Sequence, residues 1–437
     1  LQLETSFVSR QFHYHTGDVT DEHMEAANLK SSPTTQLVSQ IVMSDGRTIS
    51  YEYDKEERIT KVTDSVDGIT EYTYDALGQL LREKKDGTAV NVMTYDNYGN
   101  IKSKNGVAYT YGDGVWKDLL TKVGDDTISY DKQGNPISYL GNTLTWEKGR
   151  QLKSFGNLSY TYNANGIRTS KTNNGVKHTY TLEGTKILRE TYGNTTLVPM
   201  YDNEDSICGI IYNNVPYYFR KNLQGDIIAI VDKDAKEVAR YRYDAWGACT
   251  LVYYTNIIIA QLNPFRYRGY YYDIETNLYY LNSRYFNPSI GKFVCLDDFE
   301  TLTWSVFYPL SKNMYTYCGN NPIMGVDTNG YWNGWWNSVW FVARALDVII
   351  IAVTGGIAIH GINQIKKFLR DNARKLVKNI AKQLMAMIGS TVANAVSSIV
   401  DIALTIFGTS IGDLIARAID WCDPWWGKTR NNGYVFG

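Results

Sequence analysis

A short phrase recurs through the first half of the chain, most completely as Tyr72-Thr73-Tyr74-Asp75-Ala76-Leu77-Gly78. The other copies share an aromatic residue followed by an acidic or amide residue. They are Tyr51-Glu52-Tyr53-Asp54, Tyr95-Asp96-Asn97-Tyr98-Gly99-Asn100, Tyr130-Asp131-Lys132-Gln133-Gly134-Asn135, Tyr160-Thr161-Tyr162-Asn163-Ala164-Asn165-Gly166 and Tyr241-Arg242-Tyr243-Asp244-Ala245-Trp246-Gly247, with a weaker copy at Trp146-Glu147. The recurrence of such a phrase along a chain is typical of repeat proteins.

The phrase predicts a β-hairpin. Tyr-x-Tyr alternation places both rings on one face of a strand, because successive side chains of a strand point to opposite faces. Asp-x-x-Gly supplies a turn in which the Asp side chain caps the backbone and the Gly can take a positive φ. One hairpin cannot bury its aromatic face alone, so neighbouring hairpins must pair or stack into a long continuous sheet.

Composition divides the chain near residue 330. The 437 residues exceed the usual size of one domain and carry a net charge of -1, which argues against the whole chain binding nucleic acid. Residues 331–437 contain 11 Lys or Arg and 6 Asp or Glu, a net charge of +5, so residues 1–330 carry -6. The same boundary separates 33 of the 35 tyrosines from the rest, and no glutamate follows it.

The repeat phrases resemble the YD repeats of the RHS and teneurin families from about Asp45 to Asp244. The resemblance implies that hairpins wind into a spiral shell around a hollow interior, of which this chain holds a part. Residues 1–40 carry no clear copy and are interpreted as a truncated preceding repeat. We call residues 1–262 the repeat region.

A longer motif follows at residues 263–330, which we call the core segment. The run Arg266-Tyr267-Arg268-Gly269, continuing through Asp273, Leu278-Tyr279-Tyr280, Arg284-Tyr285-Phe286-Asn287-Pro288 and Gly291-Lys292-Phe293, resembles the RHS-associated core. The family's core ends in Pro-x-x-x-x-Asp-Pro-x-Gly. Here Pro322, Asp327 and Gly330 match that ending, and Thr328 replaces the second proline.

The same resemblance implies that the core cuts its own chain just after this ending. Matching motif to motif, the candidate carboxylates are Asp273 and Asp297, Arg284 is the assisting cation, and the cut falls near Tyr331 and Trp332. The chemistry would be that of two carboxyl groups that share one proton. A structural alternative stays open, in which Asp273 caps a turn and Arg284 with Asp297 forms an ion pair that stabilises the core.

We call residues 331–437 the tail and predict that it forms a smaller all-α domain. The predicted fold is therefore mainly β, followed by helices. Residues 346–362 form an apolar run at the lower edge of transmembrane length. Residues 366–384 predict an amphipathic helix with an apolar stripe. Its basic face would contact anions or a membrane through Lys367, Arg370, Arg374, Lys375, Lys378 and Lys382.

Three activities compete for the tail: a membrane-active effector hidden in the shell, a compact helical domain without a membrane role, and an enzymatic toxin of the nuclease type. The tail has one His, one Cys and no Glu, which leaves few residues for metal or nucleophile chemistry. The chain as a whole predicts no cofactor, no metal site and no clear nucleic-acid partner. The five cysteines form no CxxC pair.

The predicted function is the C-terminal part of a secreted or cell-surface bacterial toxin of RHS type, in which the β-shell encloses the tail. The expected partners are an immunity protein, an anionic membrane and the chain's own shell around the tail. The chain begins at Leu1 without a signal peptide, so we expect its secretion signal on upstream sequence. The alternative is a wall-associated repeat protein that binds carbohydrate or protein through its tyrosines.

Overall fold

The repeat phrases form the strands of a long antiparallel sheet in the computed structural model, which describes residues 10–16, 34–112, 116–203, 205–297 and 313–331. All of these residues belong to one of the two units into which the chain divides. Within them the sheet has 24 strands, and each strand pairs antiparallel with the next strand along the chain. Local pairing of this kind follows from the short turns.

The strands of this sheet are mostly four to eight residues long. They are β1 (Arg10–Thr16), β2 (Thr34–Met43), β3 (Thr48–Tyr53), β4 (Ile59–Asp64), β5 (Gly68–Tyr74), β6 (Leu80–Lys85), β7 (Thr88–Tyr95), β8 (Ile101–Lys104), β9 (Val107–Tyr111), β10 (Leu120–Val123), β11 (Asp126–Tyr130), β12 (Pro136–Tyr139), β13 (Asn142–Glu147), β14 (Gln151–Phe155), β15 (Leu158–Tyr162), β16 (Arg168–Asn173), β17 (Val176–Glu183), β18 (Lys186–Tyr192), β19 (Thr195–Tyr201), β20 (Ile207–Tyr212), β21 (Val215–Lys221), β22 (Ile227–Val231), β23 (Glu237–Tyr243) and β24 (Cys249–Tyr254).

In the phrases that contain Asp or Asn, this side chain caps the turn as the residue types predict. Asp75 Oδ1 accepts hydrogen bonds from the backbone N–H groups of Leu77 and Gln79, both at 2.9 Å. Gly247 closes the equivalent turn at φ +90°, and a Cβ atom there would lie 2.6 Å from the ring of Tyr267. The turn glycine at this position therefore provides both a left-handed backbone and space for the core segment.

The aromatic residue directly before the Asp, Asn or Glu of a phrase reaches back to the preceding hairpin, and Tyr111 and Tyr201 at the ends of β9 and β19 do the same. We call this contact the aromatic latch. The tyrosine hydroxyl, or the indole N–H of tryptophan, donates a hydrogen bond to a main-chain carbonyl 10 to 16 residues earlier. The pairs are Tyr53 to Val38, Tyr74 to Ile59, Tyr95 to Leu80, Tyr111 to Ile101, Tyr130 to Leu120, Trp146 to Pro136, Tyr162 to Leu152, Tyr201 to Ile187 and Tyr243 to Ile227. The indole N–H of Trp146 replaces the phenol, which explains why the weaker copy keeps an aromatic residue.

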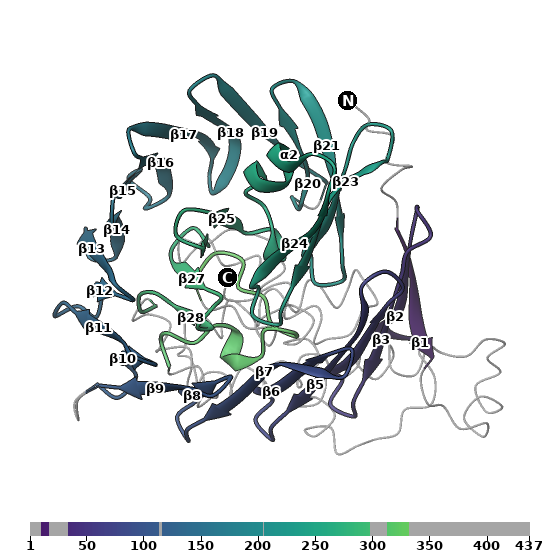
Figure 1. Cartoon of the computed structure of the whole chain (residues 1–437), viewed down its shortest axis with the longest axis horizontal. Coiled ribbons are helices and arrows are strands. Elements are labelled where there is room, and N and C mark those ends of the chain that lie inside the picture. Colours follow the sequence, from purple (N-terminus) through teal and green to yellow (C-terminus); the bar gives the residue numbers. More distant parts are fainter. Residues whose placement is uncertain (1–9, 17–33, 113–115, 204, 298–312, 332–437) are drawn as a thin grey trace, which may run out of the picture. The chain divides into compact units, whose positions relative to one another are not determined.

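The core segment forms a second, smaller antiparallel sheet that the long sheet curves around (Figure 1). A short helix, α2 (Ile257–Leu262), and a 3-10 turn, η1 (Tyr267–Gly269), lead into it, and a second turn, η3 (Cys318–Asn320), follows it. Its strands are β25 (Tyr271–Asp273), β26 (Leu278–Tyr280), β27 (Tyr285–Asn287) and β28 (Lys292–Phe293).

The core segment is held by the turns of the surrounding repeats. Tyr279 donates to the carbonyl of Gly247 at 2.8 Å, Tyr315 to that of Gly134 at 2.7 Å, and Asn320 to that of Gly99 at 2.7 Å. These glycines come from three repeat phrases spread along the chain. The turn that builds each hairpin thus also supplies a binding point for the core.

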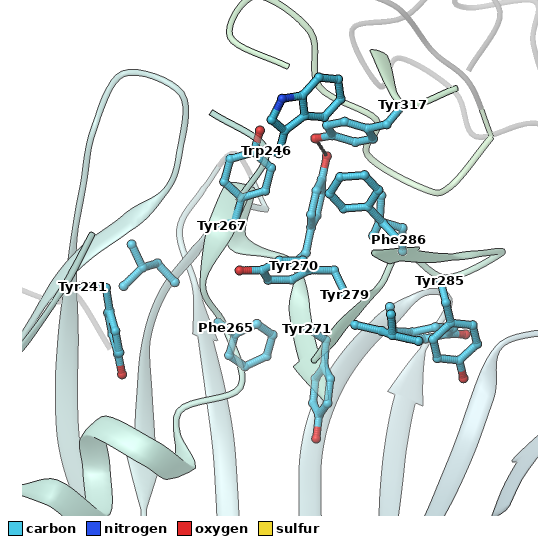
Figure 2. Close-up of a cluster of buried hydrophobic side chains, with 14 of the residues drawn as sticks. Tyr241, Trp246, Phe265, Tyr267, Tyr270, Tyr271, Tyr279, Tyr285, Phe286 and Tyr317 are labelled. Atoms are coloured by element: carbon cyan, nitrogen blue, oxygen red, sulfur yellow. Dashed lines mark hydrogen bonds between the residues drawn. The ribbon is translucent and has the colours of Figure 1, made fainter. Parts of the chain in front are cut away.

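Packed aromatic side chains fill the middle of the core segment (Figure 2). The hydroxyls of Tyr270 and Tyr317 lie 3.1 Å apart, and the ring of Tyr317 stacks on Phe286 with centroids 4.1 Å apart. Trp246 from a repeat turn and Tyr267 from η1 lie beside them (Figure 2). The tyrosines of the core thus serve as hydrophobic packing with hydrogen-bonded tips.

The prediction of a mainly β chain is confirmed, as a long, open antiparallel sheet with few helices in the described part. No helix among the described residues is long and apolar enough to cross a membrane. The predicted helical tail lies outside the described residues, apart from Tyr331.

Candidate self-cleavage site

Arg284 lies in the turn between β26 and β27 and is the centre of a buried charge cluster. Its side chain is 3% exposed, and its Nη2 atom lies 3.0 Å from Asp297 Oδ2 and 3.2 Å from Asp327 Oδ2. Asp297 follows β28, whereas Asp327 belongs to the segment that ends the core. One guanidinium therefore joins two carboxyl groups from distant parts of the core segment.

The remaining donors of Arg284 bond the main chain. Nη1 donates to the Met314 carbonyl at 3.0 Å, and Nε donates to the carbonyl of Gly330. The guanidinium also lies over the Phe293 ring, 3.5 Å from its centroid. The planar, always-charged fork of arginine suits this arrangement, because each nitrogen can donate in a fixed direction. Arg284 thus connects the two carboxyls to the main chain at Gly330.

Asp327 is fully buried, and its environment favours the protonated form. Burial, together with the nearby charge of Asp297, raises the pKa of Asp327 to about 7, although Arg284 and the backbone N–H groups of Gly330 and Asn329 lower it. Its Oδ1 accepts the Gly330 N–H at 2.8 Å. Two carboxyls thus share one guanidinium, and one of them has a pKa near 7.

Gly330 fits only because it lacks a side chain. Its φ is +76°, and a Cβ atom would lie 2.5 Å from both the Leu281 carbonyl oxygen and Ser283 Oγ. Ser283 in turn holds the preceding carbonyl, that of Asn329, through its hydroxyl at 2.9 Å and its backbone N–H at 3.2 Å. The chain is therefore pressed against the β26–β27 turn at the end of the core segment.

Asp273 has a different environment from the one that the sequence suggests. Its carboxylate lies 2.5 Å from Arg168 Nη1 and 3.0 Å from Lys171 Nζ, both in β16. Burial alone would raise the pKa of Asp273, but the two cations outweigh it and lower the pKa. Asp273 thus forms an ion pair between core and repeats, and the carboxyl that shares Arg284 with Asp297 is Asp327 instead.

Of the other predicted site residues, some lie in the described part of the chain and some lie outside it. Pro322 is buried, and its carbonyl accepts from the Tyr267 hydroxyl at 3.2 Å and from Arg268. Tyr331 is 36% exposed, and its N–H donates to Asn329 Oδ1 at 3.1 Å. Trp332 and the six basic residues from Lys367 to Lys382 lie outside the described residues.

The comparison with protein families decides the identity of the chain. Residues 24–323 match the family described as the teneurin YD-shell. The chain belongs to the teneurin YD-shell family. The resemblance to RHS and YD-repeat proteins that the sequence shows is thereby confirmed.

Two bacterial nucleases are similar to this YD-shell chain over part of its length. It is 36% identical over 293 residues to the tRNA3(Ser)-specific nuclease WapA of Bacillus spizizenii and 37% identical over 293 residues to the tRNA nuclease WapA of Bacillus subtilis. Each match covers 62% of this chain and 12% of the relative. The chain therefore spans about an eighth of the length of these relatives.

Solved structures share the YD-shell fold. The crystal structure of TcdB2-TccC3-Cdc42 matches with a TM-score of 0.55 at 19% identity, covering 74% of this chain and 18% of that one. A structure of the Photorhabdus luminescens Tc holotoxin pore matches with a TM-score of 0.54 at 18% identity, with the same two coverages. At this identity the likeness concerns the fold.

The sequence did not predict the contacts of three residues in this part of the YD shell. Asp327 was recognised as a motif residue but not as the partner of Asp297, and nothing pointed to Arg168 or Ser283. Arg168 lies 105 residues from Asp273, so no local spacing could connect them. For Asp327 a signal existed, because an Asp three residues before a required Gly can bond that glycine's N–H.

Proposed function

We propose that this chain is the closing part of an RHS-type toxin, in which a spiral YD shell carries a C-terminal tail and the core segment cuts the chain to separate that tail. The observation that carries the proposal is Arg284, which binds the buried carboxyls of Asp297 and Asp327 and the carbonyl of Gly330. This cluster lies where the core segment ends and the composition of the chain changes.

The chemistry is hydrolysis by a pair of carboxyl groups. Asp327, whose pKa is raised to about 7, acts as the acid that protonates the leaving nitrogen. Asp297 acts as the base that takes a proton from water, and Arg284 holds the two carboxyls together while one of them is ionised. The ion pair of Asp273 with Arg168 and Lys171 fastens the core segment to the repeats instead of taking part.

The activity of the tail is proposed separately from that of the core segment. The family match ends at residue 323, so it does not cover residues 331–437. We propose a small all-α effector that acts on an anionic membrane through its basic face, is enclosed by the shell before release and is neutralised by an immunity protein. Secretion or display at the cell surface follows from this role.

The test of self-cleavage uses the full chain produced by cell-free synthesis and followed on a denaturing gel. Wild-type protein should separate into two fragments, whereas Asp297→Asn and Asp327→Asn should remain intact or slow by at least about 100-fold, as expected for loss of a general acid or base. Asp125→Asn is the matched control, because Asp125 is fully exposed and far from the core in sequence. Unchanged cleavage in both core variants would refute the proposal.

A further inference from the structure

The early strands β3–β7 and the late strands β21–β24 of the long sheet meet along a line that we call the seam (Figure 1). Arg220 Nη1 of β21 lies 2.6 Å from Asp45 Oδ2, and Arg242 Nη2 of β23 lies 3.2 Å from Asp67 Oδ1. Among the described residues, no early strand pairs with a late strand. The seam is therefore a line along which this turn of the sheet can part without loss of a strand ladder.

Two carboxyl groups face each other across the seam, those of Glu83 in β6 and Asp244 after β23. The side-chain amide of Asn91 donates to Glu83 Oε2 at 2.6 Å and to Asp244 Oδ2 at 3.0 Å. Glu83 Oε2 also accepts the N–H of Ala245 at 2.9 Å. Lys104 Nζ lies 3.9 Å from Asp244 Oδ2. One cation therefore stands near two carboxyl groups that share one amide donor.

The other groups around Glu83 do not compensate its negative charge. Tyr72 and Tyr74 of β5 face it as neutral phenols, because burial raises the pKa of both hydroxyls. Burial lowers the pKa of Lys104, whose ammonium also donates to the Pro288 carbonyl at 3.0 Å. The further charged residues that line the same cavity have partners of their own: Arg47 with Asp64 and Asp67, Arg242 with Asp67, Arg268 with Asp226, and Lys85 with Thr70.

A cavity of about 360 Å³ runs along the seam, and both Glu83 and Asp244 line it. Water in this space gives protons a path to Glu83, although that residue is only 3% exposed. Burial, together with the nearby charge of Asp244, raises the pKa of Glu83 to about 7, although the Ala245 N–H, Asn91 and Lys104 lower it. The charge of this cluster therefore changes near neutral pH.

We propose that the seam is a pH-sensitive closure, in which protonated Glu83 holds the early and late repeats together and ionised Glu83 lets them part. With Glu83 neutral, Asp244 is the one negative charge of the cluster, and Lys104 faces it. With Glu83 ionised, two negative charges repel each other in a site of low dielectric constant. The inference concerns the opening of the shell and does not depend on the proposed self-cleavage.

Acid closes the seam, and a rising pH loosens it. The closed seam raises the pKa of Glu83 above its ordinary value of 4.5, so the closed form binds a proton that the open form releases. This stabilisation is complete below about pH 4.5 and is lost as the pH rises through about 7. Between these values, the ratio of closed to open seam should fall by up to about tenfold for each pH unit.

Amide hydrogen exchange at Ala245 reports on the seam directly, because this N–H is bonded to Glu83. It is measured on the full chain from about pH 5 to about pH 8 and corrected for the intrinsic exchange rate at each pH. The protection factor of the Ala245 N–H should fall by at least about tenfold over this range. That of the Asn135 N–H, which is bonded within one repeat turn to Asp131, should stay constant. Constant protection at Ala245 would overturn the proposal.

Glu83→Gln imitates the protonated carboxyl at every pH. Its amide keeps an oxygen for the Ala245 N–H and carries no charge, so protection at Ala245 should stay at its acid level up to about pH 8. Glu52→Gln is the matched control, because Glu52 is 61% exposed in β3 and pairs with Lys61 at the surface. This control should keep the pH profile of wild type. A Glu83→Gln protein with the wild-type profile would show that Glu83 is not the sensor.

Asp244→Asn tests the second carboxyl group and decides the matter if Glu83→Gln fails to fold. An asparagine oxygen can still accept the N–H groups of Trp246 and Ala248, which Asp244 Oδ1 now accepts, so the turn is kept. Removal of the like charge leaves Lys104 to face Glu83 alone. The midpoint of the protection profile should therefore move to lower pH, and an unchanged midpoint would overturn the proposed repulsion.

Discussion

At the residue scale, the protonation of Asp327 decides what the charge cluster can do. Asp327 is completely buried beside Asp297 and Arg284, and desolvation outweighs the attraction of the guanidinium, so the pKa rises. Asp273 shows the opposite result in the same core, because two cations outweigh its burial and lower the pKa. The pKa values of two buried aspartates are thus shifted in opposite directions, for a reason that lies in their neighbours.

This difference predicts the pH dependence of self-cleavage. With the pKa of Asp327 near 7, its protonated form is present below that value and is lost as the pH rises through it. Since the acid must be protonated, the cleavage rate should fall about tenfold for each pH unit above about 7 and level off below it. Precursor kept at high pH and then diluted into buffers between about pH 5 and pH 9 gives the profile on a denaturing gel. A rate that rises with pH across this window would contradict the assignment of Asp327 as the acid.

At the element scale, the aromatic latch joins each hairpin to the one before it. Between the neighbouring strands β4 and β5 the paired residues run from Lys61 with Glu71 to Asp64 with Gly68, and Tyr74 of β5 donates to the Ile59 carbonyl beyond that range, at the start of β4. The contact satisfies a main-chain acceptor near the register shift between Glu52 and Tyr53. A tyrosine is suited to this position because its ring packs inward while its hydroxyl reaches the carbonyl.

Removal of one latch hydroxyl should destabilise the repeat region measurably. Tyr74→Phe keeps the ring but leaves the Ile59 carbonyl without this donor, which should lower the free energy of unfolding by about 1–2 kcal/mol. Urea titration of the full chain with local hydrogen exchange at β4 and β5 measures the effect. Tyr98→Phe is the control, because Tyr98 is 61% exposed and should change stability little. Equal stability of both variants would show that the latch hydroxyl contributes nothing.

At the scale of the whole described unit, the core segment holds the curved sheet from inside. Its residues bond strands and turns across much of the repeat region, from Gln79, which accepts from Asn320 at 2.8 Å, through Glu190 of β18, which accepts from Tyr271 at 2.9 Å, to Gly247, which accepts from Tyr279 at 2.8 Å. Arg242 of β23 also pairs with Asp67 between β4 and β5, at 3.2 Å. Late repeats therefore meet early repeats, and a sheet built only from local pairings acquires long-range connections.

The proposed tail activity belongs to this scale, because it depends on release from the shell. Purified full chain after self-cleavage should release dye from vesicles rich in anionic lipid and release little from neutral vesicles. Replacement of Lys367, Arg370, Arg374, Lys375, Lys378 and Lys382 by glutamine should reduce release from anionic vesicles by at least about tenfold. If wild type and this variant release dye equally, the basic face is not the membrane-binding element.

The sequence by itself determined the repeat, its turns and the sheet, because those depend on interactions within a few residues. Tyr-x-Tyr alternation and Asp-x-x-Gly turns are local, and the structure shows both where the phrase predicts them. The core segment was recognisable for the same reason, as a continuous motif.

Only the tertiary structure decided which charges meet. It places Asp273 with Arg168 and Lys171, more than 100 residues away, and Asp297 with Asp327 on Arg284. The protonation of a buried carboxyl depends on burial and on which cations face it, and neither follows from spacing along the chain. The repeats could be derived from the sequence, whereas the chemistry of the candidate site required the packing of the core segment inside the sheet.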